Sequence, residues 1–399
     1  MPPAKTATPP TGGKTQQAQP RPQPFRVGVY ETTTPDADVS LAISTGQQKL
    51  STWKVSPNGW LSGIWSLFEA PTTANAATVA FQPDAPFSAI FKVTVRDLGN
   101  REIFGPLTGY EWFTVNKWGG YFGGVDGSDP RNPMTFLATA GAGATGGSFR
   151  FGLYLPLELV HRDTLGEIEN KSSSSSYTLE IYIDSSANIY STPPTTLPTI
   201  RWRANLDGYT EPEDADAYGR PLSSTPPAAG TVQYWTSEVF LTPNGLYKYN
   251  IQNGIGYSLR NIAMVGYGAT AGTRAACAYQ AGVGATQFSP DPRTLSFGKV
   301  QLAQLPLAMW LDKMSKWWEL ESGTADTFLG PENGVWIMPF TRDFINSVGD
   351  ELRNAYLSTK AGNVLQDSGT VNLSGGINQH YLINYVVPPG NDPARLRSR

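Results

Sequence analysis

The sequence is poor in cysteine, in charged residues and in long apolar runs. Cys277 is the only cysteine among 399 residues, so the chain has no internal disulfide and needs no oxidising compartment to fold. Charged residues make up 16% of the chain and the net charge is −3, whereas a general nucleic-acid-binding protein needs a basic excess. No run of about 18 apolar residues occurs, so we expect no transmembrane helix. Residues 1–26 lack the apolar core of a signal peptide, and we expect a soluble chain that folds in the cytoplasm.

Residues that could carry catalysis are also scarce. His161 and His380 are the only histidines, and we interpret them as hydrogen-bonded structural residues. Cys277 stands among small residues and is interpreted as a core residue. The sequence has no G-x-S-x-G motif, P-loop or dinucleotide-binding glycine pattern. We therefore predict no catalytic residue, no cofactor and no enzymatic activity.

Two acidic clusters offer the oxygen ligands that calcium uses. They comprise Glu211, Glu213, Asp214 and Asp216 in the first cluster, and Asp126 and Asp129 in the second. Neither has the full spacing of a known calcium loop. We interpret the clusters as a solvated linker and a turn, and predict no metal site.

What the sequence does have is typical of an all-β protein with many loops. Aromatic residues make up 12% of the chain, which also has 41 glycines and 32 prolines. Four segments alternate apolar and polar residues as half-buried strands do: 91–98, 147–160, 177–184 and 199–206. Two segments have helical spacing: 306–322 and 342–359. The predicted class is mainly β with a few short helices.

Two pairs of similar segments indicate an internal duplication. "SPNGWLSGIW" (56–65) resembles "TPNGLYKYNI" (242–251), and Pro57 and Pro243 are 186 residues apart. "LYLPLELVHRDTLGEIEN" (153–170) resembles "VWIMPFTRDFINSVGDELRN" (335–354), and Pro156 and Pro339 are 183 residues apart. The similar offsets predict a repeated unit of about 180 residues. A unit of this length fits an eight-stranded jelly roll better than an immunoglobulin sandwich of about 100 residues.

The duplication and the composition together predict five segments. They are an extended basic N-terminal arm (1–26), a first jelly roll (27–210), a linker (211–230), a second jelly roll (231–388) and a basic C-terminal tail (389–399). The arm contains seven prolines and no acidic residue, which favours an extended chain. By their charge alone, we predict that basic residues of the two ends contact lipid headgroups or a neighbouring molecule: Lys5, Lys14, Arg21, Arg26, Arg395, Arg397 and Arg399.

The stretch "GPLTGYEWFTVNKWGGYFGG" (105–124) has three possible interpretations. Its aromatic rings could stack on sugars, or on nucleic-acid bases with Lys117 as a phosphate contact, or they could pack a β-sheet core. We predict packing or interface roles for Tyr110, Trp112, Phe113, Trp118, Tyr121 and Phe122. Strict alternation would place Tyr110, Trp112 and Thr114 on one face of a strand, with Phe113 and Val115 on the other. Such a strand would be covered by the core on one face and by a neighbour, such as another subunit, on the other.

With the duplication in view, the sequence resembles the double jelly-roll major capsid proteins of tectivirus-like bacteriophages, which are tailless, icosahedral and contain an internal membrane. The resemblance covers about residues 27–390. It is carried by 84–121, by 151–170 with its counterpart 335–354, and by 357–390. In 84–121 a Pro-Phe pair leads into a strand, an Asp-x-Gly turn follows, and a Gly-Tyr strand leads to Asn116-Lys117.

The resemblance implies a homotrimer whose six jelly rolls form a pseudo-hexagonal capsomer. Such capsomers tile an icosahedral virion shell over a lipid membrane, beside penton and minor capsid proteins, and no sequence-specific nucleic-acid binding is implied. The protein would fold in the host bacterial cytoplasm and then reside in the virion. Two alternatives stay open at this point. One is a carbohydrate-binding or glycan-cleaving β-sandwich, suggested by 11 Trp and 18 Tyr, and the other is a minor capsid, penton or spike protein.

Overall fold

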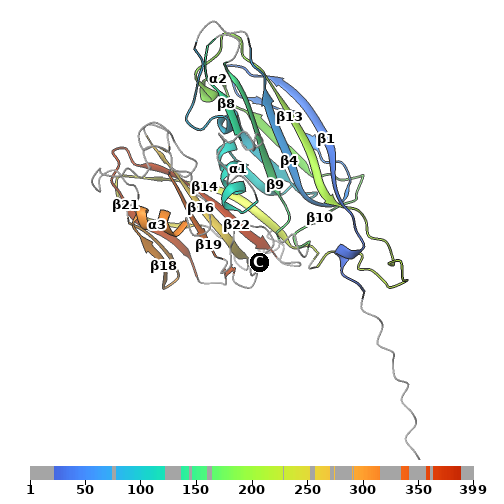
Figure 1. The fold of residues 1–399 in the computed structure, drawn as a ribbon. Helices are drawn as coiled ribbons and strands as arrows, with labels where there is room; N and C mark the ends of the chain where they lie inside the picture. Colours follow the sequence, from blue (N-terminus) through green and yellow to red (C-terminus); the bar gives the residue numbers. More distant parts are fainter. Residues whose placement is uncertain are drawn as a thin grey trace, which may run out of the picture.

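The computed structural model shows two β-sandwich units packed side by side (Figure 1). It describes residues 22–73, 78–121, 136–142, 146–159, 164–227, 229–251, 257–269, 274, 290, 292–314, 334–340, 356–359 and 363–387. The first unit is formed by residues up to strand β13, and the second begins with strand β14.

The first unit has two facing sheets. One contains, in spatial order, β1 (Glu31–Ala42), β13 (Thr199–Tyr209), β4 (Gly59–Ala70), β9 (Ser148–Pro156) and β8 (Phe136–Thr139), with β10 (Ile168–Asn170) beside β4. The other contains β7 (Glu102–Leu107), β6 (Ile90–Arg96), β11 (Thr178–Ile183) and β2 (Gln48–Lys49), with β3 (Trp53–Lys54) beside β11. The smaller elements are β5 (Ala80–Phe81), which pairs with β12 (Tyr190–Thr192), the 3-10 turns Phe25–Val27 and Phe87–Ala89, and the helices α1 (Gly109–Trp118) and α2 (Ser186–Ile189).

The second unit repeats this plan. One sheet contains β14 (Val232–Thr242), β22 (Ile377–Val387), β16 (Ser258–Gly268) and β19 (Val335–Pro339), with β20 (Leu357–Ser358) beside β16. The facing sheet contains β15 (Gly245–Ile251), β21 (Leu365–Val371), β17 (Arg293–Phe297) and β18 (Val300–Leu305), and β18 is followed by α3 (Leu307–Met314). A single parallel bridge, Trp235 to Phe104, joins β14 to β7 and so links the two units.

Both units have the strand order of a jelly roll. Eight main strands can be numbered along each unit, with β2 and β3 counted together in the first and the short β5, β8, β10, β12 and β20 left out. The two sheets then have the orders 1-8-3-6 and 2-7-4-5 in both units. This double Greek key defines the jelly roll, so the predicted mainly-β, double jelly-roll fold is confirmed.

The four strands predicted from alternation are all present, as β6, β9, β11 and β13. The predicted helix 306–322 is confirmed for α3 (Leu307–Met314), while 315–322 lie outside the described residues. The predicted helix 342–359 lies mostly outside them as well. Its end, Leu357–Ser358, forms strand β20 instead of a helix, because it pairs with Ser258 and Leu259 of β16.

The prediction that Tyr110 to Val115 lie on a strand was wrong, because they belong to the helix α1 (Gly109–Trp118). Its N-terminus has a capping box: the Glu111 amide donates to Thr108 Oγ1 at 3.2 Å, and the Thr108 amide donates to Glu111 Oε2 at 2.7 Å. All ten residues of α1 are buried, although four of them are polar or charged: Glu111, Thr114, Asn116 and Lys117. The predicted separation of Tyr110, Trp112 and Thr114 from Phe113 and Val115 across a strand therefore does not exist.

One of the two predicted repeats has a counterpart in the fold. Trp112 and Trp310 are each the fourth residue of their helix. The Trp112 indole donates to the Tyr154 carbonyl at 2.8 Å, and the Trp310 indole donates to the Ile337 carbonyl at 3.0 Å. Each carbonyl precedes by two residues the proline that ends its strand, Pro156 in β9 and Pro339 in β19.

The other repeat is not structurally equivalent. The Pro-Asn-Gly turn at Pro57 leads into β4, the third main strand of the first roll, whereas the turn at Pro243 leads into β15, the second main strand of the other roll. Each turn places its glycine at positive φ, 71° at Gly59 and 111° at Gly245. The two segments therefore share a local turn chemistry, and the agreement of their offset with that of the proline pair is accidental.

Candidate assembly surfaces

Helix α1 of the first roll packs on the outer face of the second roll's β14-β22-β16 sheet. Tyr381 of β22 points into the second roll's own core, where its hydroxyl donates to Asp367 of the facing sheet at 2.8 Å. Because side chains alternate along a strand, the next residue, Leu382, points outward, and so does Ala263, its partner on β16. Both are nevertheless buried, since the first roll covers them.

Hydrogen bonds between the rolls form along the length of α1. Near its start, Glu111 Oε1 accepts from Ser237 Oγ at 3.3 Å and lies 2.7 Å from His380 Nδ1. At its end, the Trp118 carbonyl accepts from Asn261 Nδ2 at 2.8 Å, and the Gly119 carbonyl accepts from Arg260 Nη2 at 3.0 Å. The last carbonyls of a helix have no partner within the helix, so the second roll satisfies the C-terminal end of α1.

A buried cation adds a second connection between the rolls. Arg274 of the second roll is 2% exposed and lies 2.7 Å from Asp84 of the first. Its guanidinium also lies 3.8 Å from the centre of the Tyr110 ring, a cation–π geometry that is strengthened when water is excluded. Tyr110 therefore contributes to the junction between the rolls.

The aromatic residues singled out in the sequence lie in the interior. Tyr110, Trp112, Phe113 and Trp118 are buried, Tyr121 is half-buried, and Phe122 lies outside the described residues. Phe113 stacks on Phe87 at 4.4 Å. Lys117 is 1% exposed, so it is not available as a phosphate contact. The described part of the stretch therefore offers neither a sugar-stacking nor a base-stacking platform, and the neighbour that covers it is the second roll of the same chain.

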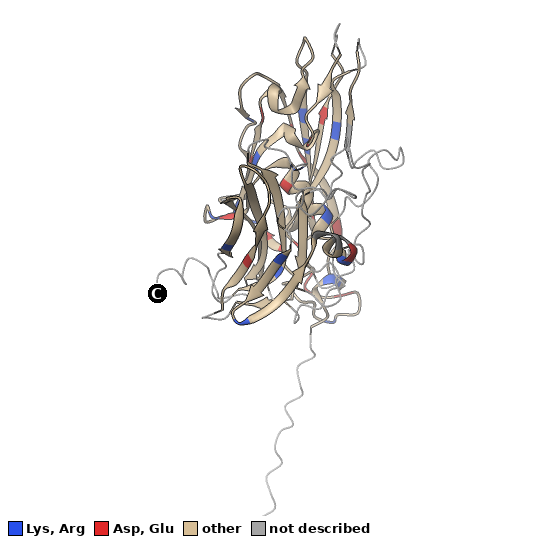
Figure 2. Cartoon of the chain, turned by 90° about the vertical axis from the view of Figure 1, so that its left-hand side faces the viewer, with Lys and Arg blue, Asp and Glu red and all other residues tan. Residues whose placement is uncertain are grey.

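The basic residues predicted to contact lipid or a neighbour are mostly outside the described residues. These are Lys5, Lys14, Arg21, Arg395, Arg397 and Arg399. Arg26 is described, and it donates to the Tyr209 hydroxyl at 3.0 Å and lies 3.6 Å from Glu31. Beside it, the buried Phe25 ring packs edge-on against Trp60. In the view of Figure 2, basic and acidic residues are scattered among one another over the two rolls.

Next to Arg26, the first roll buries the carboxyl group of Glu167. Glu167 is 2% exposed, and neither of its oxygens has a partner among the described residues. Burial, together with the nearby Glu158, raises the pKa of Glu167 to about 9. The folded protein therefore keeps this proton at neutral pH, whereas the unfolded chain releases it near pH 4.5. Stability consequently falls as the pH rises from about 4.5 towards 9.

Replacing Glu167 by glutamine should remove this pH dependence. At pH 7 we expect the free energy of unfolding to rise by about 3 kcal/mol, given about 1.4 kcal/mol for each pH unit above the unfolded pKa. Thermal unfolding followed at pH 5, 7 and 8.5 would show the gain growing with pH. Glu169→Gln is the matched control, because Glu169 lies two residues further along the chain, in β10, and is exposed. A gain that is equal at all three pH values would contradict the protonated state of Glu167.

The other predicted features give no reactive site within the described residues. Asp216 accepts hydrogen bonds from the amides of Tyr218 and Arg220 and pairs with the Arg220 side chain at 2.6 Å. Among the residues that the structure describes, no group of three or more His, Cys, Asp or Glu side chains could hold a metal ion. His161, Cys277, Asp126 and Asp129 lie outside those residues. In the same part of the chain, no helix is long and apolar enough to cross a membrane.

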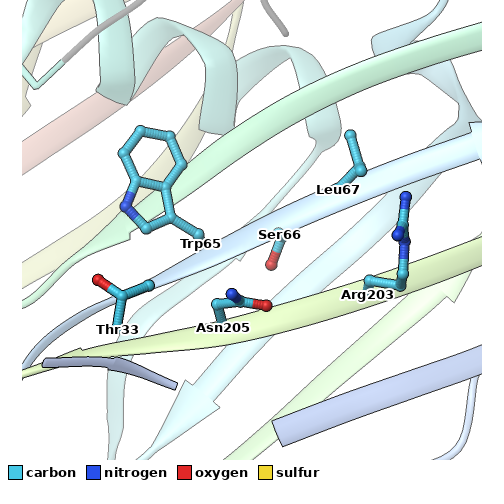
Figure 3. Close-up of a pocket in the computed structure, with 6 residues that line it drawn as sticks. All are labelled: Thr33, Trp65, Ser66, Leu67, Arg203 and Asn205. Carbon is cyan, nitrogen blue, oxygen red and sulfur yellow. The ribbon is translucent and has the colours of Figure 1, made fainter. Parts of the chain in front are cut away.

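The outer face of the first roll carries a hollow that the sequence did not indicate. It has a volume of about 340 Å³ and is lined by Thr33, Trp65, Ser66, Leu67, Arg203 and Asn205 (Figure 3). Trp65 is 36% exposed, although its ring lies 4.8 Å from that of Tyr154. Beside the hollow, Arg203 and Arg150 both pair with Glu69, and Arg201 pairs with Asp38 at 2.5 Å. The face thus combines an exposed aromatic ring with a row of ion pairs.

No family model and no curated protein sequence matches this chain. Solved structures do match. The STIV MCP superposes with a TM-score of 0.58 at 10% identity, covering 90% of this chain and 97% of that one. The chain has the double jelly-roll fold. The major capsid protein P2 from bacteriophage PM2 matches with a TM-score of 0.50 at 8% identity, covering 91% of this chain and 100% of that one. The PBCV-1 virus capsid matches with a TM-score of 0.53 at 9% identity, covering 95% and 97%. At these identities the likeness shows the double jelly-roll fold and does not transfer residue roles.

Proposed function

We propose that this double jelly-roll chain is a major capsid protein that assembles as a homotrimer into pseudo-hexagonal capsomers of an icosahedral shell. The observation that carries the proposal is the tandem of two equivalent jelly rolls, which three chains would extend to six similar units. The match to double jelly-roll capsid proteins over 90% or more of this chain supports it. Because those proteins are structural, we propose no enzymatic activity.

We further propose that the basic ends of the chain serve the assembled shell. The arm (1–26) and the tail (389–399) would contact neighbouring capsomers or an internal lipid membrane. Between them we place the two rolls at 27–210 and 231–388, joined by a linker at 211–230. Their support is charge: the arm has no acidic residue, and basic segments bind anionic lipid surfaces. Penton and minor capsid proteins would be further partners. The virion would be the final location, after folding in a bacterial host's cytoplasm.

Light scattering of the purified protein tests the trimer. We expect a particle of about 130 kDa, three times the 43.2 kDa chain, and hexagonal outlines in negative stain. A monomer at micromolar concentration would overturn the proposal. A variant lacking residues 1–21, which keeps the buried Phe25, should still form trimers but assemble shells poorly and bind anionic vesicles less. Unchanged assembly and unchanged vesicle binding would refute the role of the arm.

A further inference from the structure

The two rolls of one chain meet through unlike surfaces. The first roll contributes α1, and the second contributes the outer face of β14-β22-β16. Each roll also has an equivalent of the surface that the other roll contributes. Helix α3 of the second roll is the equivalent of α1, and the outer face of β1-β13-β4-β9 of the first roll is the equivalent of β14-β22-β16. Figure 1 shows that this last sheet lies on the side of the molecule away from the second roll. Contacts between unlike surfaces repeat from copy to copy and can close into a ring.

Strand register identifies which residues of the first roll are equivalent to those under α1. Pro339 of β19 pairs with Asn261, and Pro156 of β9 pairs with Gly63. Counting two residues along β16 and along β4 makes Ala263 equivalent to Trp65. Counting four makes Val265 equivalent to Leu67. On the second roll, Ala263 and Val265 are 1% and 0% exposed.

The equivalent positions on the first roll border an open hollow. Trp65 and Leu67 line it together with Arg203, which pairs with Leu67 across β13 and β4 (Figure 3). Arg203 Nε is buried and has no hydrogen-bond partner among the described residues. The first roll therefore has a cavity and an unused donor at the place where the second roll has a helix seated on it.

The equivalent position on α3 is an exposed methionine. The matched tryptophans, Trp112 and Trp310, align the two helices, so Met309 corresponds to Glu111, the residue that reaches Ser237 and His380 across the junction. Met309 is 57% exposed. A thioether packs well against an aromatic ring and adapts to irregular spaces. Asp312, three residues on and on the same face of the helix, is also exposed and would bring a carboxylate towards Arg203.

We propose that Met309 of one copy docks into the hollow formed by Trp65, Leu67 and Arg203 of a second copy, and that this contact joins the chains of the trimer. The proposal depends on the proposed function, because it names the surfaces through which that trimer forms. It requires each chain to give one helix and one sheet face, so that three identical contacts close the ring.

Cysteine cross-linking tests the contact in the full chain. In a Cys277→Ser background, Leu67→Cys combined with Met309→Cys should give covalent dimers and trimers with a short bismaleimide reagent. Each single variant should stay unlinked. Tyr218→Cys combined with Leu246→Cys is the matched control, since those side chains are 86% and 85% exposed and lie outside both surfaces. Trimers that cross-link no better at 67 and 309 than at the control pair would overturn the proposal.

A charge substitution gives an independent measurement. Met309→Lys should weaken trimer formation at least tenfold, because it places an ammonium group against Arg203, whereas Val300→Lys, on a residue of similar exposure (62%), should have little effect. If the double-cysteine chain fails to fold, the comparison of Met309→Lys with Val300→Lys tests the proposal instead. A trimer dissociation constant of Met309→Lys equal to that of the wild type would overturn it. A monomeric wild-type protein would instead overturn the proposed function, so the two failures are distinguishable.

Discussion

Replacing Asp367 by asparagine should lower the free energy of unfolding by about 3–5 kcal/mol, because it leaves a buried cation without its counter-charge. Asp367 and Arg293 are 0% and 1% exposed, and Asp367 Oδ2 lies 2.7 Å from Arg293 Nη2. The same oxygen accepts from the hydroxyls of Tyr247 and Tyr381 at 2.9 and 2.8 Å. Denaturant unfolding followed by tryptophan fluorescence should report the loss, since the Arg293 guanidinium lies 4.7 Å from the Trp336 ring centre.

Two further variants make this result specific to burial. Asp38→Asn breaks the Arg201 pair on the surface of the first roll, where both side chains are about half exposed. Such exposed pairs contribute little, so the unfolding midpoint should not move measurably. Replacing Arg293 by methionine together with Asp367 by leucine should recover only part of the stability. The apolar pair needs no desolvation of charge, but the buried hydroxyls of Tyr247 and Tyr381 lose their acceptor. An Asp367→Asn midpoint equal to that of Asp38→Asn would show that the buried pair does not stabilise the roll.

The strands of this fold were predictable because each has one face on a core. β13 alternates buried Ile200, Trp202 and Ala204 with more exposed Arg201 and Arg203, and this period of two is visible in the sequence. The number of strands and the length of the repeat then favoured a jelly roll over shorter sandwiches. Local pattern and chain length thus carried the fold class.

Helix α1 was mispredicted because its composition favours strands while its environment favours a helix. Aromatic and β-branched residues such as Phe113, Thr114 and Val115 are enriched in strands. With both rolls around it, the segment has no polar side, so no helical period appears in the sequence. The one local signal was the spacing of Thr108 and Glu111, which is that of a capping box. In the prediction, the strand-like composition of the segment counted for more than this two-residue capping signal.

The role of the junction could not be predicted, because it depends on contacts between residues far apart in the chain. Glu111 meets His380 across 269 positions, and Trp118 meets Asn261 across 143. Nothing in the local sequence of either partner marks it. The hollow beside Trp65 was missed for a related reason. The sequence does not show that the outward-pointing Trp65 lies next to Arg203 and Asn205, which come from a different strand.

The two pairs of similar segments differ in whether the similarity reflects the same position in the two rolls. A Pro-Asn-Gly turn depends only on the backbone conformation of its own four residues, so it can recur between any two strands. A tryptophan that donates to the strand after its helix needs the helix, the strand and their packing together. The pair Trp112 to Tyr154 and Trp310 to Ile337 is therefore the stronger mark of equivalence.

Because the two tryptophans are equivalent, truncating either one should destabilise its own roll to a similar extent. We expect Trp112→Ala and Trp310→Ala each to lower the free energy of unfolding by about 3–5 kcal/mol, through the cavity left by a side chain that is 0% or 1% exposed. The phenylalanine variants should retain most of the packing but lose the indole donor. At Trp310 this removes the hydrogen bond to the buried Ile337 carbonyl and should cost about 1–3 kcal/mol. At Trp112 the loss should be smaller, because the Tyr154 carbonyl also accepts from the Asn116 side chain. Thermal unfolding of all four variants beside the wild type measures these losses.

Trp65→Ala is the control that shows whether the loss of stability comes from removing a buried side chain or from removing any tryptophan. Trp65 is partly exposed and makes no part of either roll's interior, so we expect its truncation to leave the unfolding temperature of the isolated chain nearly unchanged while it weakens trimers. Trp112→Ala should in addition loosen the junction, because α1 holds the second roll, whereas α3 packs beside β18 and β19 of its own roll. A neutral Trp310→Ala would show that α3 is not the counterpart of α1, and the assignment of Met309 to the place of Glu111 would fail with it.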